Sequence, residues 1–223
     1  MTGPLLEIRS LVKEYEQAGG RVRALCLDSL TAGKGEAIAV TGPSGSGKTT
    51  LLHLLAGLIA PSGGSVRFGG HDPAAPDDNA RWRAANVGYV FQDLNLLPDF
   101  DVLENLLIAA EISQIPLNTA YERAFTLLER LKLGDRLRHR PAKLSLGEQQ
   151  RAAIARAVIH KPPLILADEP TASLDSVNAE NVMNLLMELC SGSLLIVATH
   201  DEAVKKRFPR IVELRKTEGL ACA

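Results

Sequence analysis

The sequence is poor in aromatic residues and has no long block of one charge. Phenylalanine, tryptophan and tyrosine make up 4% of the 223 residues, so base stacking on nucleic acid is not expected as its main activity. The 25 Lys and Arg and the 26 Asp and Glu give a formal charge of −1, which argues against a polybasic module for nucleic acid or lipid. We therefore expect no nucleic acid among its partners.

Cysteine and long apolar runs are also scarce. The three cysteines, Cys26, Cys190 and Cys222, include no CxxC pair, so neither a disulfide framework nor a zinc site is expected, and a reducing cytosol fits. The first ten residues lack a charged segment followed by an apolar one, so no signal peptide is expected. The longest apolar stretch, residues 51–60, is about half of a membrane span. A membrane role would need another chain for the span.

Short apolar segments alternate with helical patterns along the chain. With 46% hydrophobic and 23% charged residues, the composition is that of a globular protein, and its length fits one α/β domain or a domain with an inserted lobe. Runs rich in β-branched residues at 36–41, 87–91, 164–168 and 194–199 predict strands buried in a mostly parallel sheet. Residues 6–11 and 65–68, beside glycine-rich turns, predict a small antiparallel β layer.

Strand signals are missing between Asp93 and Lys161. Asp101, with Glu104 three residues later, predicts a capping box at the start of one helix, and residues 118–133 predict a second, amphipathic helix. We therefore expect a helical subdomain at about residues 93–161, inserted into a core formed by about residues 1–92 and 162–223.

The segment GPSGSGKT matches the phosphate-binding pattern GxxxxGK[ST] in full, between a predicted strand and a predicted helix. Backbone N–H groups in such a loop converge on phosphate oxygens at a helix N-terminus. Lys48 would bridge the β- and γ-phosphates, and the Thr49 hydroxyl would help to hold Mg²⁺. A glycine-rich turn that happens to carry a lysine would not explain both the spacing and the context. The candidate nucleotide-binding residues are Gly42, Pro43, Ser44, Gly45, Ser46, Gly47, Lys48, Thr49 and Thr50.

Two acids, Asp168 and Glu169, end the predicted strand 164–168. The carboxyl ends of parallel strands face the ligand crevice of an α/β sheet. Asp168 is expected to coordinate Mg²⁺ directly or through water, and Glu169 to polarise the water that attacks the γ-phosphate. Adjacent acids at a strand end are often only a solvated turn, but the phosphate loop in the same chain favours a catalytic role.

Together these motifs resemble the nucleotide-binding subunit of ATP-binding cassette (ABC) transporters over essentially the whole chain. Four more segments carry the resemblance: VFQD resembles the Q-loop, LSLGEQQR the family signature, SLD the D-loop, and TH the switch histidine. The residues at their key positions are Gln92, Ser145, Gly147, Glu148, Asp175 and His200.

The resemblance implies a P-loop NTPase core that binds ATP and Mg²⁺ and hydrolyses ATP. It gives Gln92 and His200 catalytic roles beside Glu169, with Gln92 also at the metal. In the family, the signature faces the γ-phosphate bound to the opposite subunit, so the active unit would be a dimer around two ATP molecules. Four residues are thereby implied to contact nucleotide: Ser145, Gly147, Glu148 and Asp175.

Each of these residues has a simpler reading when taken alone. Gln92 could be a surface amide, His200 a histidine near a helix N-cap, and Asp175 only a helix cap. Ser145 and Glu148 have capping-box spacing, and the same helix start is also an anion site. The signature departs from LSGGQ at Leu146 and Glu148, and an acid there adds negative charge near a polyanion.

Tyr15 lies where the family places an aromatic residue that stacks on adenine. Its flat apolar face suits that role, although core packing near an N-terminal strand is an equal alternative.

The resemblance also implies a partner in the membrane. The segment from Asp93 to Ile115, next to Gln92, would contact a transmembrane permease subunit, which would hold this cytoplasmic chain at the inner face of the membrane. Several segments are similar to the branch of lipoprotein-releasing and macrolide-efflux ATPases. An alternative is an ATP-gated signalling module like the cell-division ATPase of that branch, whose signature also carries GEQQ. The transported substrate is not encoded in this chain.

Overall fold

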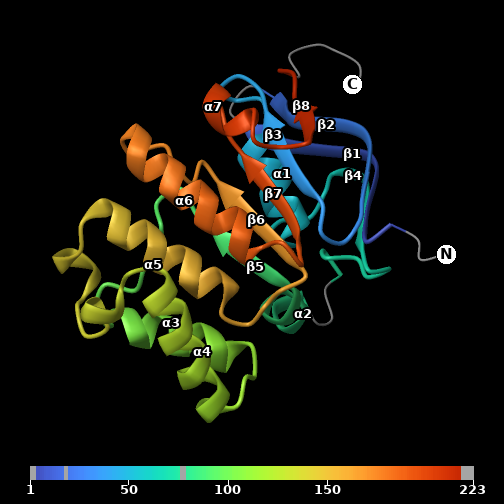
Figure 1. Ribbon diagram of the computed structural model, residues 1–223. Coiled ribbons are helices and arrows are strands. Elements are labelled where there is room, and N and C mark those ends of the chain that lie inside the picture. Colours follow the sequence, from blue (N-terminus) through green and yellow to red (C-terminus); the bar gives the residue numbers. More distant parts are fainter. Residues whose placement is uncertain (1–3, 18–19, 76–78, 217–223) are drawn as a thin grey trace.

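Two β-sheets and a helical lobe make up the described residues, 4–17, 20–75 and 79–216, of the computed structural model (Figure 1). The larger sheet has five parallel strands in the order β5-β6-β7-β3-β8. Every residue of β6 and β7 is buried, which is why these strands are continuous apolar runs. The strands span β3 (Ala37–Thr41), β5 (Val87–Val90), β6 (Leu164–Asp168), β7 (Leu194–Ala198) and β8 (Arg210–Glu213).

The predicted parallel strands are confirmed at β3, β5, β6 and β7, and β8 was not predicted. The expected antiparallel layer is also present, in the order β2-β1-β4. It comprises β1 (Leu6–Gln17), β2 (Gly20–Ala32) and β4 (Gly63–Phe68). β2 escaped prediction because its first half is exposed and polar, so no apolar run marks it. Helix α1 (Lys48–Leu55) shares one hydrophobic core with strands of both sheets.

The helical lobe lies beside the parallel sheet, on the far side from β1, β2 and β4 (Figure 1). It contains α3 (Val102–Ile112), α4 (Leu117–Arg130) and α5 (Leu146–Val158). The capping box of Asp101 and Glu104 forms as expected, and the second predicted helix is α4. The lobe has its own core, to which α5 contributes Ala152 and Ala155. The same helix packs Ile154 against the core beneath the parallel sheet.

The remaining α-helices of the described chain are α2 (Asn79–Asn86), α6 (Ser176–Leu189) and α7 (Glu202–Lys205), and two short 3-10 helices span Gly134–Arg136 and Pro141–Lys143. Residues of α6 pack with β6 and β7 in one core. No helix among the described residues is both long and apolar enough to cross a membrane.

The sequence did not predict a disulfide bond, and the structure differs from that expectation at one described cysteine. Cys26 is disulfide-bonded, whereas Cys190 is a free, buried thiol whose pKa is raised by burial to about 12. Cys222 lies outside the described residues.

Candidate nucleotide-binding site

The phosphate-binding loop connects the end of β3 to the start of α1, and glycine is required in it for geometric reasons. Gly42 and Gly47 have φ angles of 147° and 93°, which side-chain-bearing residues rarely adopt. A Cβ atom at Gly47 would lie 2.3 Å from the Ala24 carbonyl oxygen, and one at Gly42 would lie 2.4 Å from that of Leu214. The loop is therefore folded tightly against the neighbouring backbone.

The loop also concentrates hydrogen-bond donors. Gly47 is the N-cap of α1 and provides no side-chain cap, so the first N–H groups of this helix are left for a ligand. Lys48 Nζ donates to the carbonyl oxygens of Gly42 at 2.9 Å and Pro43 at 3.3 Å, so the ammonium lies within the loop. The arrangement suits an anion such as phosphate.

A cavity of about 600 Å³ opens beside this loop, and its size suits a small-molecule ligand. It gathers the loop with residues from three strand ends, because the carboxyl ends of parallel strands meet at one sheet edge. Ala24 and Ala172, which carry no chemical signal in the sequence, also line it. The predicted residues in the lining are Gly42, Pro43, Ser44, Gly45, Gly47, Lys48, Thr49, Thr50, Gln92, Asp168, Glu169 and His200.

Asp168 ends β6 and is 4% exposed. Its Oδ1 atom is buried and has no hydrogen-bond partner among the described residues. Burial raises the pKa of this carboxyl, whereas a hydrogen bond from the Thr49 hydroxyl and the charge of Lys48 lower it. An unpartnered carboxylate oxygen beside a hydroxyl fits a hard divalent cation such as Mg²⁺. The described residues contain no cluster of three or more His, Cys, Asp or Glu side chains suited to a metal.

Glu169 and His200 form a close pair in the same cavity. Glu169 Oε1 lies 2.7 Å from His200 Nδ1, and the His200 backbone N–H donates to Oε2 at 3.3 Å. Glu169 has a left-handed φ of 45°, a strained conformation for a residue other than glycine. Its own N–H donates to the Ala198 carbonyl oxygen at 2.9 Å. The bend turns the carboxylate out of the line of β6, and the histidine fixes its orientation.

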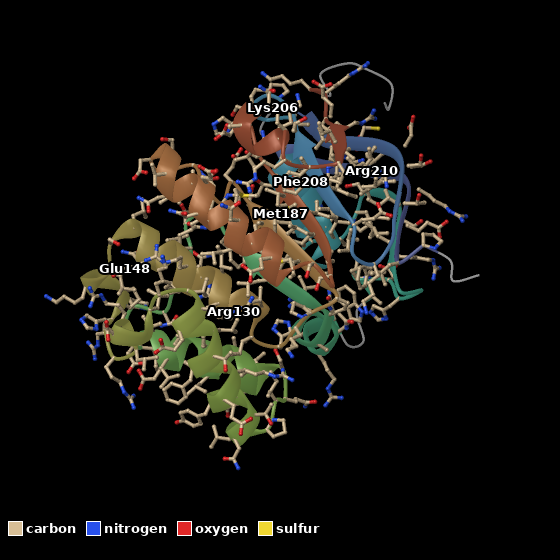
Figure 2. All side chains as sticks on the ribbon, viewed as in Figure 1. Arg130, Glu148, Met187, Lys206, Phe208 and Arg210 are labelled. Carbon is tan, nitrogen blue, oxygen red and sulfur yellow. The ribbon has the colours of Figure 1, made fainter. Side chains whose placement is uncertain are left out.

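The signature residues lie outside this cavity, at the start of α5. The Ser145 hydroxyl accepts from the Glu148 N–H at 3.3 Å, and Glu148 Oε2 accepts from the Ser145 N–H at 2.8 Å, which is the expected capping box. Glu148 Oε1 also accepts from Arg136 Nε at 2.9 Å. The Ser145 N–H and then Arg136 lower the pKa of Glu148. Its charge is thus compensated at the helix start, where it is labelled in Figure 2.

Four more predicted residues do not line the cavity. Ser46, within the loop, is buried, and its hydroxyl has no hydrogen-bond partner among the described residues. Gly147 is in the first turn of α5. Asp175 caps α6 and accepts from the Asn178 N–H at 2.9 Å. Tyr15 is 40% exposed on β1, with the Lys13 ammonium 5.2 Å from its ring centre.

Arg136 is a residue that the sequence did not identify. It lies in a short 3-10 turn, Gly134–Arg136, where no periodic pattern indicates which way a side chain points. Only its ion pair with the signature acid in the folded chain reveals its relation to the site.

Comparison with known proteins identifies the family of the chain. A family model described as "ABC transporter" matches residues 27–172. The lipoprotein-releasing system ATP-binding protein LolD of Pseudomonas fluorescens is 43% identical, over 95% of each chain. The macrolide export ATP-binding/permease protein MacB of Hyphomonas neptunium is 42% identical over 96% of this chain and 34% of its own.

A solved structure has the same fold. The dimeric ATP-binding cassette MJ0796, described in a post-hydrolysis state bound to ADP and Pi, superposes with a TM-score of 0.86 at 33% identity, over 95% of this chain and 96% of its own. On the family match and these near full-length similarities, the chain belongs to the ABC transporter family, in the branch that contains LolD and MacB, and is an ATP-binding and ATP-hydrolysing subunit.

Proposed function

We propose that two copies of this chain close around two ATP molecules, and that their hydrolysis drives a separate permease in the membrane. One observation carries this proposal. The phosphate loop, both acids and His200 line one cavity, whereas Ser145 and Gly147 of the same chain lie outside it. A two-fold dimer would bring the signature of one copy to the nucleotide of the other.

Within each site, the P-loop amides and Lys48 would bind the phosphates, with Gln92 beside them. Thr49 and Asp168 fit as the protein ligands of Mg²⁺, and Gln92 is a third candidate. The ion would neutralise charge that develops on the phosphates during transfer. Tyr15 remains a candidate for the adenine, and Asp175 for the dimer interface near the nucleotide.

Glu169 is proposed as the general base. Its carboxylate is 10% exposed and lies 2.7 Å from His200 Nδ1. Because this contact already orients the carboxylate, it would be ready to accept a proton from the attacking water. His200 would position this carboxylate and contact the γ-phosphate side of the cavity.

The permease is proposed to dock on the segment from Asp93 to Ile115. A groove of about 440 Å³ supports this, since Asn95, Ala109 and Ile112 from that segment line it opposite Tyr89 and Arg83 of the core. Helical residues 93–161 would then form the docking subdomain, with residues 1–92 and 162–223 as the ATP-binding core. The chain would work at the inner face of the membrane through this partner.

Transport is favoured over a purely signalling role, because the relatives are named for lipoprotein release and macrolide export. We propose lipoprotein extraction or a related export reaction, with no nucleic acid involved. No feature of the described structure favours the cell-division alternative.

The Glu169→Gln variant tests the dimer and the general base together. Turnover should fall by about 10²-fold or more, while ATP, but not ADP, should convert the monomer to a stable dimer on size-exclusion chromatography with light scattering. Glu213→Gln, at an exposed position on β8, is the matched control and should behave as the original chain does. Near-normal turnover in Glu169→Gln would remove Glu169 from the role, and a monomer at saturating ATP would contradict the dimer.

A further inference from the structure

A second cavity lies at the opposite edge of the parallel sheet from the nucleotide site. Its volume is about 610 Å³, and its lining includes Lys34, Pro162 and Ser193, which precede β3, β6 and β7 respectively. The phosphate loop and Asp168 instead lie at the carboxyl ends of these strands. The other wall is formed by α4 and α5 of the lobe, so this cavity joins the lobe to the core without touching the nucleotide site.

Cations gather around this cavity. Lys34, Arg123, Arg130 and Lys161 line it, and Glu122 is the only acid among the described residues that do so. Arg130 is paired with Glu188 at 2.6 Å and lies between α4 and α6 in Figure 2. Neither lysine forms an ion pair with a described residue. The rim therefore carries uncompensated positive charge.

Arg123 is the least exposed of the four cations. Its side chain is half-buried, and its Nη1 atom donates a long hydrogen bond, of 3.4 Å, to the Ile159 carbonyl oxygen. No carboxylate of the described chain lies within ion-pair distance of it. A partly desolvated guanidinium without a counter-ion is unfavourable, and its planar fork of donors matches a carboxylate or phosphate.

Apart from Thr126, Gly192 and Ser193, the remainder of the lining is apolar. Leu127 comes from the lobe, Ile165 from β6 and Leu189 from the end of α6, with Val158 and Pro162 between them. A fully hydrated inorganic ion would gain nothing from this surface, whereas a ligand with an apolar part would bury it there. The cationic rim and the apolar floor together favour a molecule that has both an anionic group and an apolar group.

We infer that this cavity binds a small amphipathic anion, a phosphate or carboxylate joined to a short apolar group. The anionic group is held by Arg123 and Lys161, and the apolar group lies on Leu127 and Leu189. Because the walls belong to both parts of the chain, the bound molecule bridges the lobe and the core.

Phenyl phosphate is a suitable probe, measured by isothermal titration calorimetry on the full chain saturated with Mg²⁺ and ADP so that the nucleotide site is occupied. Saturable binding is expected. Arg123→Gln and Lys161→Gln should each weaken it at least tenfold. Lys206→Gln, an exposed lysine outside both cavities and far from Arg130 in Figure 2, should leave it unchanged. Inorganic phosphate and phenol should each bind at least tenfold more weakly than phenyl phosphate.

Several results would overturn the inference. The first is no saturable binding of phenyl phosphate, and the second is equal binding of this probe by Lys161→Gln and Lys206→Gln. The third is equal affinity for inorganic phosphate and phenyl phosphate, which would show that an apolar group contributes nothing to binding. Lys161 is exposed, so its variant is expected to fold even if Arg123→Gln does not. Thermal denaturation of each variant with and without probe provides a second readout, since a ligand bound to the native state alone raises the melting temperature.

Discussion

Single residues in the nucleotide site combine strain with positioning. Glu169 adopts a left-handed backbone, and a Cβ atom added at Gly42 or Gly47 would lie only 2.4 Å or 2.3 Å from a neighbouring carbonyl oxygen. Unfavourable conformations of this kind persist where the surrounding structure enforces them, and they concentrate at functional sites. The strained backbone of the loop therefore lowers the stability of the folded chain, but it fixes the positions of the hydrogen-bond donors.

The tightness of the loop can be measured by comparing alanine substitutions at two of its glycines. Gly47→Ala should destabilise the chain by about 2–3 kcal/mol, because a left-handed φ is combined with a backbone clash. Gly45→Ala has a similar φ of 78° but no atom within 4 Å of the added Cβ, so it should cost only about 1–2 kcal/mol. Urea unfolding without nucleotide measures both. Equal losses would mean that the approach of the Ala24 carbonyl is not tight in solution.

Lys48→Ala should weaken nucleotide binding itself. Hydrogen bonds to charged groups contribute about 1.5–3 kcal/mol each, so a loss of about tenfold or more in affinity is expected. Binding of a fluorescent ATP analogue provides the measurement, with Lys206→Ala as the control. Unchanged affinity in Lys48→Ala would show that the loop does not hold the phosphates as proposed.

Among the structural elements, the start of α5 shows how this chain tolerates its unusual signature. An acid at a helix N-terminus is favourable for the helix, but it would repel the phosphates of a partner's nucleotide. The Arg136 ion pair and the capping bonds direct Glu148 back toward its own chain. Leu146, the other departure from the family pattern, is 43% exposed, and nothing in the described chain explains it.

Arg136→Gln should therefore lower ATP turnover several-fold at low ionic strength, with a smaller loss at high salt because the unpaired charge is then screened. Adding Glu148→Gln should restore turnover, since glutamine keeps the capping box and removes the charge. Steady-state ATPase rates of the two single variants and the double variant form the test. Failure of Glu148→Gln to rescue would mean that Arg136 acts through packing rather than charge.

Elements differed in how far the sequence predicted them. β6 and β7 were recognisable because both faces are buried, whereas half-exposed β2 and the short strand β8 carry no comparable pattern. The cavity around the phosphate loop could be assembled from motifs, because parallel strands bring their carboxyl ends together. The second cavity could not, because its walls come from strand starts and two helices whose packing only the folded chain defines.

At the scale of the whole molecule, the proposed dimer completes each nucleotide site with the partner's signature, and a mixing experiment tests this. Lys48→Ala disables the loop, and Ser145→Arg blocks the signature. If the signature acts in trans, a mixed dimer pairs one intact loop with one intact signature, so mixing the two inactive variants should restore part of the ATPase activity. Activity equal to the sum of the separate variants would indicate that each site is complete within one chain.

One guanidinium, that of Arg156, connects the segment after Gln92 with the helix that carries the signature. Arg156, on α5, donates to the carbonyl oxygens of Leu94 and Asn95, which follow Gln92 and have left-handed φ angles of 60° and 48°. These hydrogen bonds join the segment after Gln92 to α5, whose N-cap is Ser145. In the proposed dimer, γ-phosphate bound at Gln92 of one copy would therefore affect the position of the signature that faces the other copy's nucleotide. Since such coupling is reciprocal, each bound ATP would influence the affinity for the other.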